Sequence, residues 1–463
     1  MIKKIGVIAG AAALISVMIS ARASAENFYA VFSCDNSVVE ANGEVYSVQG
    51  TPFLYKNNTY VPVDDILKHT GFETGWDDGL SAVVAYKDGE YSYIGVDSNV
   101  LVTGGTEFIA DVPTKMYNGV FYMPLVMYAE LSDAAIYLDG TPKKYRDLLL
   151  DTFVTDEYRL PDGIARTYKG VTIVGNRGMD ILSIPDFSAK SYAEMVNSVA
   201  RAMPEHVNVF NVALPTSCEF YAPRSLYTNQ TSGIRKIYSM LDERVTPINA
   251  VKPLMEHAAE KIYFDTDHHW TQRGAYYAYR EFAAIQGFDM PELTDFEKAD
   301  SWSHIGSFAA YTKGTYGETI MRSNPELLER FIPRVSSFGE AYTDMNMTKK
   351  YYSPSAVNTR DNTYVCFMGG DCPVAKFTTD IKNGRKLCII KESFGNAFAS
   401  WAINHYEEVY IIDPREFNGF NGHNTVFKLT SFYNNVQFND LLIINYPGSI
   451  SSSAYRNSVL NML

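Results

Sequence analysis

Two short polar stretches of the chain carry side chains suited to acyl-transfer chemistry. Asp267 and His269 are separated by one residue in the run Asp-His-His-Trp, and Ser393 lies far along the chain in the run Lys-Glu-Ser-Phe. On extended or turn backbone, residues i and i+2 point to the same side, so the carboxylate can reach Nδ1 of the imidazole while Nε2 faces outward. Serine is a poor nucleophile until a base takes its proton. The three residues therefore have the make-up of a Ser-His-Asp triad.

The same residues allow other interpretations. His268 and His269 could ligate a metal together with Asp265 or Asp267, but no third well-spaced His or Cys ligand is visible. Ser393 could serve only as the N-cap of a helix. Asp267 and His268 could form a purely structural pair. The lack of a third ligand favours the triad, and we expect neither a metal nor a cofactor.

Strands that alternate with helices must position these groups. Apolar runs predict strands at 171–175, 207–214, 386–390, 408–412 and 441–444, and helical spacing predicts helices at 188–202, 232–241, 272–282 and 394–403. Thr271 is the expected N-cap of the helix at 272–282. The alternation predicts an α/β domain with a largely parallel sheet, and the irregular stretch at 300–365 is expected to cover the sheet or the cleft.

Four polar residues follow predicted strands, at Thr216, Ser393, Arg415 and Asn445. Ligands of open α/β sheets bind at the carboxyl ends of the strands, so these residues are candidates for a site. The strand-turn-helix placement of Ser393 presents its Oγ at the sheet edge, beside free N–H groups that can hold an oxyanion. Arg415 could instead be a core ion-pair partner of its acidic neighbours, Asp413 or Glu416.

The first part of the chain repeats one pattern. Asn-Asn-Thr-Tyr-Val-Pro-Val at 57–63 leads into a predicted helix at 64–70, and Asn-Gly-Val-Phe-Tyr-Met-Pro-Leu at 118–125 leads into another apolar helix start. This is an imperfect internal duplication. The segment resembles the copper amine oxidase N-terminal-like domain of secreted bacterial proteins. The resemblance implies no copper here, because His69 is the only imidazole in the segment, and we expect a stalk without chemistry of its own.

The C-terminal part resembles a family on several motifs. These are the run at 263–279 with Asp267-His268-His269-Trp270-Thr271, the run at 214–223, Lys391 to Ala397, and Asp413-Pro414-Arg415. They are similar to the DHHW family of secreted bacterial proteins, which resembles the SGNH-hydrolase-like O-acetyltransferases of alginate acetylation. The chain departs from the family pattern at Glu392, where an aspartate usually precedes the serine.

The resemblance implies roles for individual residues. Asp267, His269 and Ser393 are the implied triad in an SGNH-hydrolase-like, doubly wound and mostly parallel sheet. Asn396 and Arg415 are candidates for oxyanion or sugar contacts, His268 either contacts substrate or points away, and Thr216 is a further candidate for substrate binding. The implied acetyl donor is presented by a membrane-bound O-acyltransferase.

Composition and the N-terminus indicate the compartment. Lys3 and Lys4 precede an apolar run that ends at Ala23-Ser24-Ala25, as in a secretory signal peptide, and an uncleaved anchor is the alternative. The net charge of −13 argues against a nucleic-acid partner. The expected organisation is a signal peptide at 1–25, a small duplicated α+β stalk at 26–140, a linker at 141–164 and a catalytic domain at 165–463.

Five cysteines cannot all pair. Cys366 and Cys372 could form a bridge, whereas Cys388 lies in an apolar run that indicates a core residue.

Three functions remain open from the sequence. The leading hypothesis is an extracytoplasmic O-acetyltransferase whose acceptor is a cell-wall or exported polysaccharide. The second is a carbohydrate esterase that uses the same triad with water as the acceptor. The third is a non-catalytic protein that binds cell-wall glycan.

Overall fold

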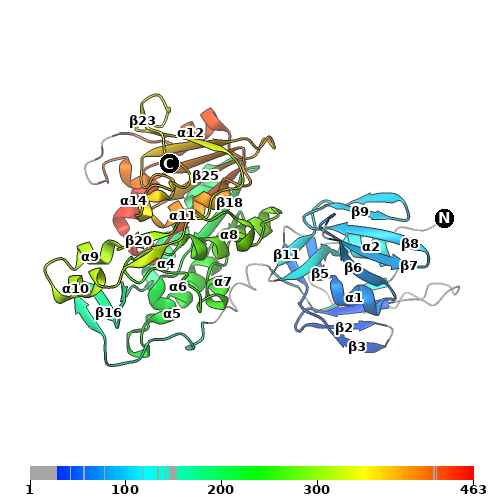
Figure 1. The fold of residues 1–463 in the computed structure, drawn as a ribbon. Coiled ribbons are helices and arrows are strands. Elements are labelled where there is room, and N and C mark those ends of the chain that lie inside the picture. The colour runs from blue at the N-terminus through cyan, green and yellow to red at the C-terminus, as the bar shows by residue number, and fades with distance from the viewer. Residues whose placement is uncertain are drawn as a thin grey trace. The chain divides into compact units, whose positions relative to one another are not determined.

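The computed structural model describes residues 29–41, 43–55, 58–77, 79–117, 119–132, 135–140, 142–144, 154–420, 423 and 425–463. Contacts divide the chain into two compact units, Met1–Leu148 with Ala283–Asp289, and Leu149–Phe282 with Met290–Leu463 (Figure 1). The expected signal peptide lies outside the described residues, as do residues 145–153 of the expected linker. Among the helices within those ranges, none has the length and apolar character needed to cross a membrane.

The N-terminal unit is rich in strands. They form three sheets with the orders β13-β1-β2-β3, β10-β9-β8-β7-β6 and β11-β12-β5-β4-β14. The strands are β1 (Tyr29–Ser33), β2 (Val38–Ala41), β3 (Glu44–Ser47), β4 (Phe53–Tyr55), β5 (Asn58–Pro62), β6 (Glu73–Asp77), β7 (Ala82–Lys87), β8 (Glu90–Gly95), β9 (Val100–Thr103), β10 (Thr106–Ile109), β11 (Lys115–Tyr117), β12 (Val120–Pro124), β13 (Ala135–Asp139) and β14 (Lys143–Lys144).

The repeated sequence pattern corresponds to two strand–helix units. β5 leads into α1 (Asp64–His69), and β12 leads into α2 (Leu125–Ser132). The two strands pair with each other in antiparallel fashion, with Val61 opposite Met123. Both side chains are fully buried in one apolar cluster that also holds Leu67 of α1 and Met127 of α2. The two copies therefore build a common core.

The C-terminal unit is organised around an eight-stranded sheet. Its order is β19 (Val245–Pro247), β18 (Asn208–Ala213), β27 (Asp440–Asn445), β25 (Lys386–Lys391), β26 (Glu408–Ile412), β24 (Val374–Thr379), β22 (Ser337–Tyr342) and β23 (Lys350–Tyr352). The first five strands are parallel to one another, and the last three pair in antiparallel fashion. Every residue of β27 is buried, as expected for a central strand covered on both faces.

Adjacent residues of β18 show which helices cover each face of this sheet. Phe210 packs against Phe282 of α8 (Gln272–Gln286), with ring centroids 5.1 Å apart. Asn211 donates from Nδ2 to the hydroxyl of Tyr192 in α4 (Asp186–Ala202) at 2.9 Å. Successive side chains of a strand point to opposite faces, so α8 and α4 lie on opposite sides of the sheet. The α/β class of this unit is confirmed, and a doubly wound sheet stays a prediction.

One sequence-based expectation about this sheet was wrong, and another was incomplete. The strand expected at 171–175 is β16 (Val171–Val174), but it pairs only with β15 (Arg166–Tyr168) and β17 (Arg177–Met179) in a small antiparallel sheet. The stretch at 300–365 does more than cover the sheet, because it supplies β22 and β23 to it. Short apolar runs reveal a strand but not its partner, and the partner decides the sheet.

The cysteines do not form the bridge that the sequence allowed. Cys366 and Cys372 are both buried and unbridged. Cys388, in the middle of β25, is fully buried, which confirms it as a core residue.

Candidate active site

A tight loop carries Asp267, His268 and His269. An isolated antiparallel bridge between Tyr263 and Trp270 closes the loop, and the N–H of Phe264 donates to the carbonyl of His269. Thr271 caps α8 as expected, because its Oγ1 accepts from the N–H of Gly274 at 3.1 Å.

Two neighbouring residues hold this loop from outside. Glu326 accepts from the N–H groups of Asp265 and Thr266 at 2.9 and 2.7 Å. Gly306 passes so close that a Cβ there would lie 2.3 Å from the Cβ of Asp267. The missing side chain lets the start of α9 (Ser307–Tyr311) reach the Asp267 carboxylate, which accepts from the Ser307 N–H at 2.7 Å.

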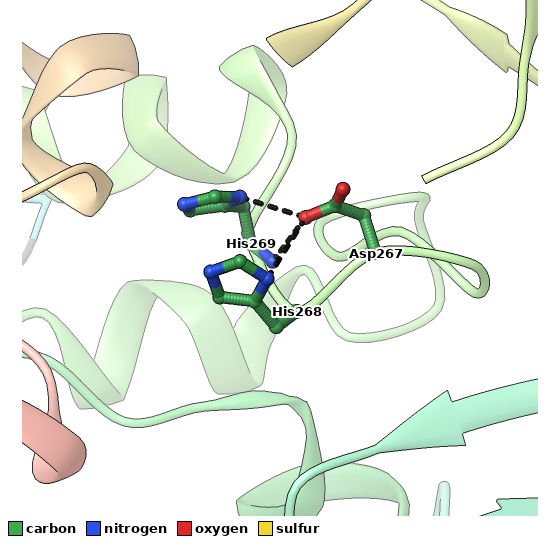
Figure 2. Close-up of side chains that lie close together, drawn as sticks. All are labelled: Asp267, His268 and His269. Carbon is green, nitrogen blue, oxygen red and sulfur yellow. Dashed lines mark hydrogen bonds and ion pairs between the residues drawn. The ribbon is translucent and has the colours of Figure 1, made fainter. Parts of the chain in front are cut away.

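The structure brings the three expected side chains into one hydrogen-bonded chain. Oδ1 of Asp267 lies 2.7 Å from Nδ1 of His269 (Figure 2), and Nε2 of His269 lies 2.8 Å from Oγ of Ser393. The imidazole also stacks on Tyr364, with ring centroids 3.8 Å apart and planes 4° from parallel. The hydrogen bonds at its two nitrogens and the stacking on Tyr364 therefore fix the orientation of the His269 imidazole.

The groups around the Asp267 carboxylate keep it ionised. Burial alone would raise its pKa, but the charge of His269 and the hydrogen bonds from His269 and Ser307 hold the pKa well below its ordinary range. A carboxylate that remains charged beside Nδ1 can stabilise an imidazolium once Nε2 has taken a proton.

Ser393 stands between β25 and α11 (Phe394–Ala402), where a buried strand turns directly into a buried helix. Its backbone is unstrained, with φ −56° and ψ −28°, and its side chain makes no capping hydrogen bond. Glu392 takes that task, accepting from the N–H of Phe394 at 3.0 Å and from that of Tyr446 at 3.2 Å. The simple N-cap interpretation of Ser393 is therefore wrong, and its hydroxyl is left to His269.

A hydrogen bond also joins the residues that follow the base and the serine. Nε1 of Trp270 donates to the carbonyl of Phe394 at 2.9 Å. Both residues are fully buried. The histidine loop and the start of α11 are thus fastened together immediately behind the His269–Ser393 contact.

Ser393, His269 and Asp267 open into a cavity of about 810 Å³ within the C-terminal unit. Its lining mixes aromatic rings with polar groups and also includes His268, His304, Ile305, Gly306, Ser307, Ala310, Tyr311, Thr363, Tyr364, Val365, Gly370, Asp371, Glu392, Asn396, Arg415, Phe420, Tyr446, Gly448, Ser449, Ser452 and Tyr455. Such a volume accommodates a small organic ligand or a sugar unit.

Asn396 and Arg415 line the cavity but are held by an aspartate that the sequence did not single out. Asp371 accepts from Nδ2 of Asn396 at 3.0 Å and from Arg415 at 2.6 Å. Arg415 also donates to both carboxylate oxygens of Asp413 at 2.9 and 2.6 Å, so the core ion pair weighed above is confirmed. Buried Lys391 completes the cluster at 2.7 Å from Asp371. Burial would raise the pKa of Asp371, but Lys391 and Arg415 hold it low.

Two of the expected strand-end residues take no part in the cavity. Thr216 is buried, its N–H donates to Oε1 of Gln230 at 2.8 Å, and its hydroxyl accepts from Nε2 of the same side chain at 2.9 Å. Thr216 is absent from the lining, so the expected substrate contact is not supported. Asn445 likewise pairs internally, accepting from Tyr192 at 3.0 Å.

The metal interpretation can be weighed against the observed hydrogen bonds. One ligand atom from each of Asp267, His268 and His269 lies within 4.8 Å of the other two. The atoms of Asp267 and His269 that a metal would need already bond to each other, to Ser307 and to Ser393. Asp265, the other expected ligand, pairs with Arg177 and Lys261. The geometry favours a proton relay, and the lack of a metal stays a prediction.

Tyr364 and Ser307 are site residues that sequence reasoning missed. Both come from the irregular stretch at 300–365, where neither apolar period nor motif marks a position. Only the three-dimensional proximity of this stretch to the histidine loop reveals them.

Comparisons with known proteins were made over the whole chain. The DHHW protein family matches residues 160–412, and the copper amine oxidase N-terminal domain matches residues 40–145. No match to a curated protein was found.

Among solved structures, a DHHW family protein from Eubacterium siraeum is 25% identical, with a TM-score of 0.55, and the match covers 65% of this chain and 97% of that one. PatB1 of Bacillus cereus with a sulfonyl adduct is 15% identical with a TM-score of 0.49, over 62% of this chain and 96% of that one. The O-acetyltransferase domain of AlgJ from Pseudomonas putida is 10% identical with a TM-score of 0.38, over 65% of this chain and 99% of that one. With more than half of its length matched by the family, this chain belongs to the DHHW protein family.

Proposed function

We propose that this protein is an extracytoplasmic O-acetyltransferase that acts on a cell-wall or exported polysaccharide through a serine acyl-enzyme. The observation that carries the proposal is the continuous chain from Asp267 through His269 to Ser393, which opens into a cavity of about 810 Å³. The proposal includes an SGNH-hydrolase-like, doubly wound arrangement of the C-terminal unit, secretion of the chain, and an N-terminal stalk.

The reaction begins with attack of Ser393 Oγ on the carbonyl carbon of an acetyl donor. Nε2 of His269 takes the hydroxyl proton, and the ionised Asp267 stabilises the imidazolium. The N–H of Ser393, which has no acceptor within the described residues, is the proposed donor to the oxygen on which negative charge develops, whereas the N–H groups of Phe394 and Gly395 are already bonded to Glu392. Collapse of the intermediate expels the donor's leaving group with the proton and leaves acetyl-Ser393.

The second half of the reaction delivers the acetyl group. A sugar hydroxyl enters the cavity, His269 takes its proton, and the acetyl group passes to the sugar oxygen. Asn396 offers an acceptor to such a ligand, because its Oδ1 is buried and has no partner among the described residues. The donor in this proposal is an acetyl group presented by a membrane-bound O-acyltransferase.

Hydrolysis by the same three residues is the second candidate function. A cavity of this volume also admits water to the acyl-enzyme, and water would then replace the sugar hydroxyl.

The experiment is to incubate the full chain with p-nitrophenyl acetate and to measure the intact mass and the release of nitrophenol. We expect one added acetyl group on the wild type, and a loss of about 10³-fold or more in acylation rate for Ser393→Ala. Ser400→Ala is the matched control, because Ser400 lies on the same helix and bonds to Gln272 away from the cavity. Equal acylation of the wild type and Ser393→Ala would refute the proposal, and a rate that EDTA abolishes would point to a metal instead.

A further inference from the structure

His268 lies beside His269 although adjacent residues usually point apart. The bend of the loop brings the two imidazole rings to a centroid distance of 3.7 Å, with planes 37° apart. Figure 2 shows both rings with Nδ1 toward Asp267 and with Nε2 on the same side, away from Asp267. On that side His269 meets Ser393, and His268 lines the same cavity. The Nε2 atom of His268 therefore faces the space beside the serine hydroxyl.

The ring of His268 is fixed through its other nitrogen. Nδ1 lies 2.7 Å from Oγ of Ser307 and 3.4 Å from Oδ1 of Asp267. The rings of Tyr311 and Phe394 flank the imidazole, with centroids at 5.8 and 5.9 Å. Nε2 has no hydrogen-bond partner among the described residues, so a fixed polar atom is left for a ligand.

The protonation state of His268 limits what that ligand can be. Burial, with the charge of His269 adding to it, lowers the pKa of His268 to about 3. The imidazole is then neutral near pH 7, so it offers Nε2 either as a donor or as an acceptor, depending on the tautomer. A hydroxyl ligand suits either tautomer of His268, because a hydroxyl group both donates and accepts hydrogen bonds. A neutral ring forms no ion pair with a carboxylate or a phosphate.

We propose that His268 Nε2 binds the acceptor hydroxyl and holds it beside the acetylated Ser393, so that transfer to a sugar competes with hydrolysis. The inference rests on the proposed function and assigns to it a residue outside the relay. Ser307 and Tyr311, both from α9, form the wall of the cavity next to this point.

The transfer step balances with no group beyond those named. The acceptor oxygen forms a bond to the acetyl carbon while its proton passes to Nε2 of His269. The bond between that carbon and Ser393 Oγ then breaks, and His269 returns the proton to the serine. His268 neither gains nor loses a proton, and its single hydrogen bond positions the acceptor oxygen for attack.

The test uses three variants of the full chain. His268→Gln places an amide group near the position of Nε2, His268→Asn places one near the position of Nδ1, and His268→Phe keeps a ring without either nitrogen. Each is supplied with p-nitrophenyl acetate as donor and, separately, with glycerol, methyl β-D-glucopyranoside and pentameric N-acetylglucosamine as acceptors. The burst of nitrophenol reports acylation, and the ratio of acetylated acceptor to free acetate reports transfer.

For His268→Phe we expect the ratio of acetylated acceptor to free acetate to fall by about tenfold or more, and the acylation burst to fall by much less than this ratio. His268→Gln should retain more transfer than His268→Asn. If Asn preserved transfer and Gln did not, His268 would act only through Ser307 and Asp267. An equal fall in burst and transfer for His268→Phe would also overturn the inference.

Failure of the inference can be told apart from failure of the proposed function. A wild type that forms acetyl-Ser393 but acetylates none of the three acceptors would overturn the acceptor site and leave the acyl-enzyme intact. A wild type that never acquires the acetyl group would refute the proposed function itself.

Discussion

The two units of the molecule bury different kinds of side chain. The N-terminal core is an apolar cluster of residues such as Val61, Leu67 and Met123, and the buried polar side chains described there are Thr70, Ser92, Thr114 and Lys115. The C-terminal unit buries a much larger set of ionisable groups, which includes Glu219, Asp267, His269, Arg330, Lys391, Glu392, Asp413 and Asp440.

This difference marks the C-terminal unit as the one whose interior holds many ionisable groups that need partners. Burying an ionised group is costly unless partners compensate for its lost hydration. In the C-terminal unit the groups around Ser393 have such partners, as Lys391 has in Asp371 and as Asp267 has in His269 and Ser307. Partnered ionisable groups therefore lie around Ser393, whereas the described interior of the N-terminal unit is mainly apolar.

The largest expected effect comes from changing a charge inside the relay. Asp267→Asn removes the negative charge beside His269, so the imidazolium is no longer stabilised and the tautomer is no longer fixed. We expect acylation by p-nitrophenyl acetate to slow by about 10³- to 10⁴-fold, measured by stopped-flow absorbance. Asp265→Asn, in the same loop but paired with Arg177 outside the cavity, is the control and should change the rate little. Similar losses in both variants would mean that the loop, not the charge, was disturbed.

A smaller effect is expected where a structural ion pair is broken. Lys391→Met removes the fully buried cation beside Asp371 and Asp413 and leaves them Arg415 alone, and we expect a loss of about 3 kcal/mol in the free energy of unfolding of the C-terminal unit. Its counterpart is Leu67→Ala in the N-terminal core, with an expected loss of about 2–5 kcal/mol and an unchanged acylation rate. Chemical denaturation measures the free energy of unfolding of each variant, and the burst assay on the folded protein measures its acylation rate. A slower burst in Leu67→Ala would remove the contrast between the units.

The smallest expected effect is a pH dependence of stability. The pKa of His268 is about 3 in the folded protein, below its ordinary value of 6.5. Between these two pH values the imidazole binds a proton in the unfolded chain but not in the folded chain. Stability should therefore fall as the pH drops, by about 2 kcal/mol between about pH 6.5 and pH 5.

Asp180 works in the opposite direction. Burial raises the pKa of its carboxyl to about 6, which favours the folded state as the pH drops. The informative quantity is thus the difference between the wild type and His268→Gln, which lacks the imidazole. Thermal unfolding at several pH values should give the variant a smaller loss of stability on acidification. Identical pH profiles would show that His268 titrates normally.

The sequence was sufficient to predict those residues and elements whose chemistry or burial shows in a few consecutive residues. Asp267 and His269 are two residues apart, and the apolar run before Ser393 marks β25 with its following helix, so these residues could be singled out without a structure. Helix α8 and strand β27 were predictable for the same reason. The family and the α/β class follow from these same segments.

The remaining features depend on contacts between distant segments. Asp371 lies in a loop and Tyr364 in a single 3-10 turn, and nothing local indicates that the first binds Arg415 and the second stacks on His269. The antiparallel end of the sheet was missed because β22 and β24 are recognisable only through their pairing. The substrate contact expected for Thr216 is not supported, because a position at a strand end does not reveal which hydrogen bonds the side chain makes. Here the Thr216 hydroxyl already accepts a hydrogen bond from Gln230.

The hydrogen bond from Trp270 to Phe394 has a consequence for motion. The base and the serine are 124 positions apart in the chain, and an ordinary breathing motion of a loop against a helix would vary the gap between them. Each is the immediate neighbour of a partner in the Trp270–Phe394 bond, so this buried hydrogen bond ties the loop to the helix next to the reactive pair. A motion that widened the gap between His269 and Ser393 would therefore also have to stretch this bond.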